Sequence, residues 1–170
     1  MFDRAVVDSV AFARESGELR ATVAVAALAR LHDALFDQSG AIAYELAGHV
    51  DREGKPSLRL ALGGELVLRC QRCLGPVRCR FDVVRNFMLV PVGEALSDPA
   101  DEAQDTEQLH ADPKLDVIGL VEDEVILGLP MVAGHEEGAC AAASPKAESR
   151  ERESPFNALA SLKRQQKSFN

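Results

Sequence analysis

Two cysteines separated by two residues, Cys70 and Cys73, are followed by Leu74, Gly75 and Pro76. Proline has no backbone N–H and clashes with the preceding helical turn, so a helix cannot run through this point. Apolar residues alternate with polar ones on both sides of the pair, as they do along β-strands. The alternating apolar residues are Leu66, Leu68 and Cys70, then Val77, Cys79, Phe81 and Val83. The pattern predicts a β-hairpin that carries the two thiols at its tip.

Thiols at this spacing serve either disulfide exchange or metal binding. A redox pair follows a strand and opens a helix, and Pro76 prevents a helix here. A turn with two cysteines at this spacing instead points both sulfurs at one tetrahedral metal ion. Metal binding is therefore the better interpretation of Cys70 and Cys73.

A closed zinc site requires four protein ligands. The only later segment with soft ligands at short spacing contains His135 and Cys140. We therefore predict a zinc site formed by Cys70, Cys73, His135 and Cys140. The alternative stays open that the cysteines are free and pack as small apolar residues. Cys79 is in phase with the core positions of its strand, so we expect it in the core. The histidines that we expect to be surface or packing residues are His32, His49 and His110.

Hydrophobic periodicity predicts the secondary structure. Residues 1–20 are interpreted as a short entry strand and a turn. Leucines at helical spacing then predict a helix that stops near Gly40. These leucines are Leu28, Leu31 and Leu35. From residue 41 to 91 the period is two, which predicts an antiparallel meander of about four strands, with a tight reversal at Gly63 and Gly64.

The predicted fold class is α+β, with an antiparallel β meander, or a small partly closed barrel, and flanking helices. Asp116 is a suitable N-cap for a helix that ends before Pro130. We expect residues 1–153 to form a single domain with a mobile acidic loop at 94–112, where few apolar groups can be buried. Residues 154–170 are predicted to form a short amphipathic C-terminal helix. Its apolar side, which we expect to bind a partner, consists of Phe156, Leu159 and Leu162.

Composition restricts the function classes. The chain has 170 residues and a net charge of −8, which opposes non-specific coating of nucleic acid. The N-terminus lacks the pattern of a signal peptide, no apolar run could span a bilayer, and four cysteines are too few for a disulfide scaffold. We therefore expect a cytoplasmic protein. No phosphate-cradling loop, paired-histidine protease motif or nucleophile elbow is present, so no enzyme class is indicated.

Five arginines nevertheless flank the cysteine pair, with Asp82 as the only acidic residue between the first and the last. Five minus one gives a local charge of +4. The five, which we predict to bind RNA, are Arg69, Arg72, Arg78, Arg80 and Arg85. Strand alternation places Arg69, Arg78 and Arg80 on one solvent face of the hairpin, where guanidinium groups suit phosphate oxygens. The alternative is an ordinary charged sheet face that the acidic loop neutralises.

Several motifs, in this order, resemble the YceD family, the large ribosomal RNA subunit accumulation proteins of bacteria and plastids. One is Cys70-Gln-Arg-Cys73-Leu after a β segment, and another is the stretch from Asp116 to Pro130. His135 and Cys140 follow at the family's spacing, and the chain closes with Pro155-Phe156-Asn157-Ala-Leu159-Ala-Ser-Leu162-Lys163. The resemblance implies a part in the synthesis or accumulation of 23S ribosomal RNA, and it implies no enzymatic activity.

We therefore expect a non-catalytic factor that binds a ribosomal RNA precursor or a large-subunit assembly protein, without a membrane or a small-molecule substrate. The alternative is a zinc-stabilised module that binds another biogenesis protein and does not touch RNA. A metal hydrolase would require an open coordination position on the zinc, which four protein ligands do not leave.

Overall fold

The computed structural model describes residues 5–96, 106–136 and 139–140. Its strands and helices belong to one compact unit that ends at Cys140. In chain order the elements are β1 (Val6–Val7), α1 (Ser9–Arg14), β2 (Glu18–Ala24), the 3₁₀ turns η1 (Val25–Ala27) and η2 (Ala29–Leu31), β3 (Ala41–Val50), β4 (Pro56–Arg69), β5 (Pro76–Val90), β6 (Glu107–His110), β7 (Leu115–Asp116) and α2 (Val117–Gly128).

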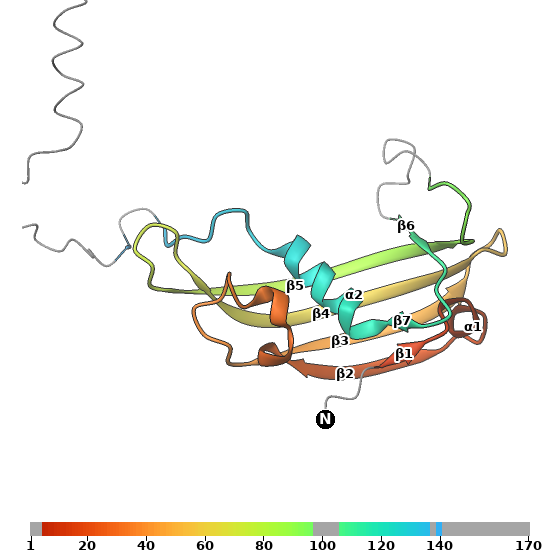
Figure 1. Ribbon diagram of the computed structural model, residues 1–170, viewed down its shortest axis with the longest axis horizontal. Helices are drawn as coiled ribbons and strands as arrows, with labels where there is room; N and C mark the ends of the chain where they lie inside the picture. Colours follow the sequence, from red (N-terminus) through yellow and green to blue (C-terminus); the bar gives the residue numbers. More distant parts are fainter. Residues whose placement is uncertain (1–4, 97–105, 137–138, 141–170) are drawn as a thin grey trace, which may run out of the picture. The chain divides into compact units, whose positions relative to one another are not determined.

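Five strands form one sheet in the order β2-β3-β4-β5-β6 (Figure 1). Strands β2 to β5 are an antiparallel meander, and β6 joins the edge in parallel to β5. The predicted α+β class and the antiparallel meander are confirmed. No ladder between the described strands closes the sheet into a barrel, because β2 and β6 are its two edges. The short strands β1 and β7 pair with each other separately.

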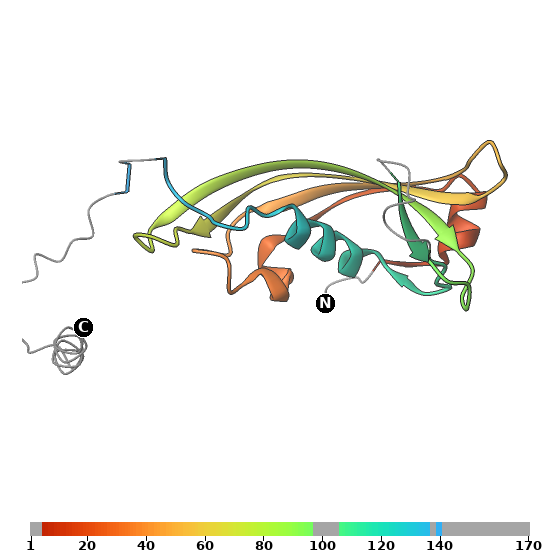
Figure 2. The ribbon, with the colours of Figure 1, turned by 90° about the horizontal axis from the view of Figure 1, so that it is seen from above.

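The sheet curves over α2 and the two 3₁₀ turns, which lie on its concave face (Figure 2). Alternate residues of β2 to β5 point into the core between these layers. Core side chains that are fully excluded from solvent include Leu28, Ile42, Leu46, Leu58, Leu60, Leu66, Val117 and Val121. The opposite, convex face of the sheet is left exposed.

Helix α2 begins and ends where the sequence predicts. The carboxylate of Asp116 accepts hydrogen bonds from the N–H groups of Ile118 and Gly119, both at 3.1 Å, and so caps the first turn. The last helical residue is Gly128, two residues before Pro130. Arg30, on η2, donates to Glu122 and Asp123 at 2.8 and 2.6 Å and fastens the helix to the turns.

The far half of β4 has a second neighbour that the sequence does not reveal. Beyond Gly64, strand β3 no longer pairs with it. The segment 34–36 takes the place of β3 there, through a bridge between Leu35 and Leu68. Phe36 N–H donates to Val67 at 2.8 Å, and Arg69 N–H donates to Ala34 at 3.1 Å.

Two predictions within the first 64 residues are wrong. The expected reversal at Gly63 and Gly64 does not exist, because β4 runs through both residues. Gly64 is small for another reason, since a Cβ atom there would lie 3.3 Å from the Phe81 ring. The leucines at residues 28–35 lie on 3₁₀ turns and a bridge rather than on an α-helix, because a spacing of three residues suits both kinds of helix.

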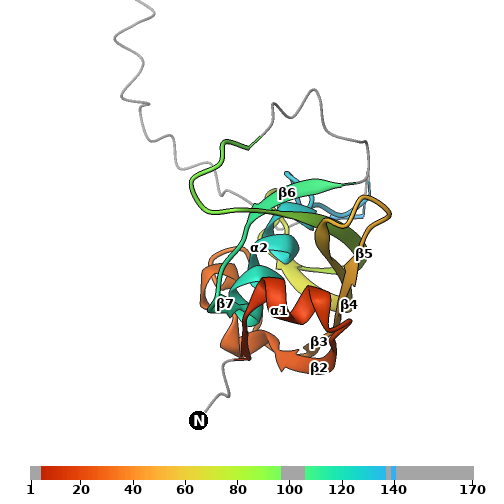
Figure 3. The same cartoon turned by 90° about the vertical axis from the view of Figure 1, so that its right-hand side faces the viewer.

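The ends of the sheet also depart from expectation. Residues 1–20 contain a helix, α1, at one end of the sheet (Figure 3), in addition to the expected strand and turn. Gly48 lets this helix approach, because a Cβ there would lie 2.4 Å from the Phe12 carbonyl oxygen. The predicted mobile loop at 94–112 is wrong for Glu107–His110, which form strand β6.

Other predictions lie outside the described residues. These are the remainder of the acidic loop at 97–105 and the C-terminal segment 154–170, with its apolar residues Phe156, Leu159 and Leu162. Of the helices that the structure describes, none has the length and apolar character needed to cross a membrane.

Candidate metal centre and arginine face

The four predicted metal ligands come together beyond the tip of the β4–β5 hairpin. Cys70 and Cys73 lie in the turn, and His135 and Cys140 come from the segment that follows α2. One ligand atom of each residue lies within 4.8 Å of the others. The Cys70 and Cys140 sulfurs are 3.8 Å apart, and His135 Nδ1 is 3.5 Å from Cys73 Sγ and 3.7 Å from Cys140 Sγ.

These separations fit a tetrahedral zinc ion. Ligands at the usual zinc–sulfur length of about 2.3 Å place two sulfurs about 3.8 Å apart on the edge of a tetrahedron. Three sulfurs and one imidazole nitrogen also form a donor set that zinc prefers. Four protein ligands would complete a tetrahedral shell, so the arrangement suits a structural ion.

The turn that carries Cys70 and Cys73 has the local conformation of a metal knuckle. Leu74 adopts a left-handed conformation with φ of 59°, which reverses the chain directly after the second thiol. Cys70 N–H donates to the carbonyl of Gly75 at 2.8 Å, and Leu74 N–H donates to that of Cys70 at 2.9 Å. Arg72 N–H points at Cys70 Sγ from 3.4 Å. Gly75 and Pro76 thus close a turn that holds both sulfurs on one side.

The histidine is oriented by a contact on its other nitrogen. His135 Nε2 lies 3.0 Å from the carbonyl oxygen of Pro76. A carbonyl can only accept, so Nε2 is the donor in this contact, and Nδ1 is the ring nitrogen that faces the sulfurs and would bind a metal ion. Two more contacts hold the segment to the hairpin: Gln71 N–H donates to Ala133 at 2.9 Å, and the Arg72 guanidinium donates to the carbonyls of His135 and Glu136.

The electrostatics of the cluster favour a cation. Backbone N–H groups of Cys73, Arg72 and His135 point at the Cys70 sulfur and lower the pKa of this thiol to about 5. Burial, together with the neighbouring sulfurs of Cys70 and Cys73, raises the pKa of the Cys140 thiol. Several thiolates this close repel one another, and a divalent cation removes that penalty.

The other candidate ligands lie elsewhere. Cys79 is half-buried and packs against the core, as expected. His49 and His110 are exposed. His32 is half-buried, and its Nε2 has no hydrogen-bond partner among the described residues.

Three of the five arginines share one exposed face, as strand alternation predicts. Arg78 and Arg80 lie opposite Val67 and Glu65 in the β4–β5 ladder, and Arg69 lies two pairs beyond Val67 toward the tip. Arg78 donates to Glu65 at 2.8 Å with four-fifths of its side chain exposed. Arg69 and Arg80 form no ion pair with any residue that the structure describes. We call Arg69, Arg78 and Arg80 the arginine face.

The other two arginines have internal partners. The Arg72 guanidinium is occupied by the carbonyls of the metal-centre segment. Arg85 lies on the core side of β5, where its Nε donates to Glu124 at 3.1 Å and lies 3.5 Å from Glu107. Glu124 is only 3% exposed, and burial raises the pKa of its carboxyl group. Arg85 therefore joins β5, β6 and α2.

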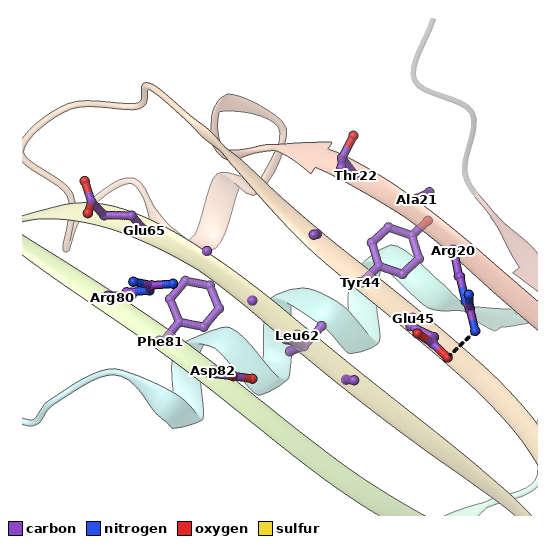
Figure 4. A pocket seen from close by; sticks show the side chains of 14 residues that line it. Arg20, Ala21, Thr22, Tyr44, Glu45, Leu62, Glu65, Arg80, Phe81 and Asp82 are labelled. Carbon is purple, nitrogen blue, oxygen red and sulfur yellow. Dashed lines mark hydrogen bonds and ion pairs between the residues drawn. The ribbon is translucent and has the colours of Figure 1, made fainter.

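A shallow depression of about 900 Å³ crosses the middle of the convex face. Small side chains of β3 and β4 form its floor, and Figure 4 shows Arg80, Glu65 and Asp82 on one side of it and the Arg20–Glu45 ion pair on the other. Two arginines and three carboxylates give its lining a charge of two minus three, or −1. This charge disfavours phosphate, so the depression is a poorer candidate for RNA than the arginine face.

Comparison with known proteins identifies the family of this chain. A family model described as "Large ribosomal RNA subunit accumulation protein YceD" matches residues 58–163, well over half of the chain. This chain belongs to the YceD family. The match begins in β4 and contains the hairpin, α2, the four clustered ligands and the predicted C-terminal helix up to Lys163. No solved structure matches the chain.

Proposed function

We propose that this YceD-family protein is a non-catalytic factor in the assembly of the large ribosomal subunit. The family description, which names accumulation of the large-subunit ribosomal RNA, carries the proposal. The protein would act in the cytoplasm, where thiols such as those of the cluster stay reduced. No small-molecule substrate and no membrane are part of this proposal.

We further infer that the cluster holds structural zinc. Its Cys₃His donor set, its separations and the fixed histidine support this assignment. The ion would connect the hairpin tip to the segment after α2, and four protein ligands would leave it no position for an activated water. A structural ion agrees with a binding protein rather than with a hydrolase.

Direct contact with a ribosomal RNA precursor would occur at the arginine face. Arg69 and Arg80 have no described ion-pair partner, and Arg78 is largely exposed. Guanidinium groups donate in pairs to phosphate oxygens. The metal centre lies directly beyond this end of the hairpin, so the ion would keep the tip rigid next to the face.

Charge reversal tests this contact. The double variant Arg78→Glu and Arg80→Glu should weaken the binding of large-subunit precursor RNA. The slope of the logarithm of the binding constant against the logarithm of the salt concentration should also become shallower, by about 0.7 to 0.9 for each lost phosphate contact. A matched variant, Arg20→Glu and Arg59→Glu, changes the net charge equally at exposed positions of β2 and β4 away from the tip. Equal loss of binding in both variants would show that only the net charge matters and would refute the site.

One observation favours a second mode of action, in which the protein binds an assembly partner without touching RNA. The family match extends through Phe156, Leu159 and Leu162 to Lys163, so the predicted partner-binding helix lies within the shared region. Deletion of residues 155–170 should then remove a copurifying protein and leave the salt dependence of RNA binding unchanged. If the Arg78 and Arg80 variant still associates with precursors and only the deletion fails to, this second mode is correct.

A further inference from the structure

Among the phenylalanine and tyrosine side chains of the described residues, Phe36 is the one with a large exposed fraction, 44%. Its neighbour Leu35 is only 2% exposed and pairs with Leu68 on the core side of the sheet. Ladder hydrogen bonds lie on both sides of the Leu35 bridge, and neighbouring residues of such a ladder point to opposite faces. Phe36 begins a bend, but its N–H still donates to the Val67 carbonyl at 2.8 Å, and its exposed ring beside the buried Leu35 indicates the convex face.

This position puts Phe36 in a row with the arginine face. Val67 pairs on its other side with Arg78, so the row runs Phe36, Val67, Arg78 across three neighbouring segments. Adjacent strands are about 4.8 Å apart, which places the backbones of Phe36 and Arg78 about 10 Å from each other. Arg69 lies two residue pairs further toward the tip, on the same face, opposite Ala34 and Pro76.

Charged groups of both signs surround the Phe36 ring, and two of the arginines have no ion-pair partner among the described residues. Glu65 pairs with Arg78, and Asp37 follows Phe36 in the chain. A hydrogen bond from Ser39, with a smaller contribution from Arg78, lowers the pKa of the Asp37 carboxyl group. Arg69 and Arg80 have no such partner among the described residues. An exposed aromatic ring beside unpaired guanidinium groups matches a ligand that combines a flat apolar surface with negative charge.

We propose that Phe36 stacks on an unpaired base of RNA while the arginine face binds the adjoining phosphates. This inference rests on the proposed function and specifies its RNA as single-stranded. In a duplex, the faces of the bases are covered by their neighbours, so only an unpaired base offers a face to the ring. Stacking on an aromatic ring tolerates any base, so the site selects unpaired nucleotides rather than a sequence.

The absence of tryptophan from the chain provides a direct reporter. The variant Phe36→Trp places a single indole at the site, and its fluorescence should be quenched when a short single-stranded RNA oligonucleotide is added to the full-length protein. The duplex formed with the complementary strand should quench it far less. A matched variant, Val84→Trp, places the indole on β5, on the same convex face and at a similarly exposed position, 43%. Its fluorescence should not change when the RNA is added.

Affinity measurements separate this inference from the proposed function. Phe36→Ala should weaken binding of the single strand by roughly five- to 150-fold, the range found for loss of one stacking contact, and leave the salt slope unchanged. Phe36→Tyr should restore binding. If Arg78→Glu with Arg80→Glu weakens binding but Phe36→Ala does not, the RNA contact stands and the stacking is refuted. If neither variant affects RNA but Phe36→Ala abolishes capture of an assembly protein, the face binds protein, and both the RNA contact of the arginine face and the stacking of Phe36 are refuted.

Discussion

Replacing Cys73 with serine removes one of the four ligands from the cluster and should release the metal. A serine hydroxyl stays protonated near neutral pH, whereas a cysteine ligand binds zinc as the thiolate. We expect the wild-type protein to carry about one equivalent of zinc, as a single four-ligand site requires. The Cys73→Ser variant should carry almost none.

The size of the structural effect follows from the contacts that remain. Without metal, the segment after α2 is held by a few hydrogen bonds, such as Gln71 N–H to Ala133 at 2.9 Å and His135 Nε2 to Pro76 at 3.0 Å. Two such bonds at about 1 kcal/mol each favour the closed segment by a factor of about 30, and the Arg72 guanidinium adds its contacts to the carbonyls of His135 and Glu136. Zinc at about a thousand times its Kd would add about 4 kcal/mol, or a factor of about a thousand.

Hydrogen exchange at the Gln71 amide measures this difference. Its proton should exchange about a thousand times more slowly in the zinc protein than in Cys73→Ser. Amides in the middle of β4, such as that of Leu60, should be unaffected, since the core contains little of the metal-centre segment. Cys79→Ser is the control and should keep its zinc. A folded, metal-free wild type from zinc-replete, reducing conditions, with Gln71 exchange insensitive to chelator, would refute the site.

Two further predictions concern the fold. Gly48→Ala should destabilise the protein by about 2 kcal/mol, because the new Cβ would lie 2.4 Å from the Phe12 carbonyl oxygen. The same change at Gly63, where nothing lies within 4 Å, should be nearly neutral in denaturant titrations. The raised pKa of Glu124 means that wild-type stability declines relative to Glu124→Gln as pH rises from 4.5 through the folded pKa. A pH-independent difference between these two proteins would contradict the buried position of Glu124.

The sequence predicts those parts of the molecule whose conformation is determined by residues close together in the chain. The hairpin tip follows from Gly75 and Pro76, and the start of α2 follows from the Asp116 cap. The metal ligands could be grouped because so few soft side chains follow the first pair. Gly63 and Gly64 do not identify a turn, because a pair of glycines is compatible with a chain reversal and also with a continuous strand. Here the strand continues, and the missing side chain of Gly64 leaves room for the Phe81 ring.

The remaining features depend on contacts between distant residues. Strand β6 is four residues long and acquires its structure from the edge of β5. Phe36 lies beside the arginine face only because segment 34–36 replaces β3 along the end of β4. An apolar residue next to Leu35 carries no signal of this pairing in the sequence. One hint is available: Phe36 falls out of phase with the leucines that enter the core.

The wide separation of the clustered ligands along the chain has a consequence during synthesis. Cys70 and Cys140 are 70 residues apart, so at 5–20 residues per second the first thiols leave the ribosome about 4 to 14 seconds before the last ligand. The sheet and α2 precede Cys140 and can fold in that interval. Throughout this time the first two sulfurs have no partners from the later segment and are open to oxidation or to a foreign metal. If the cluster holds zinc as proposed, maturation of the hairpin tip would be the last step in the folding of this domain, and it would depend on the reducing power and the zinc supply of the cell at that moment.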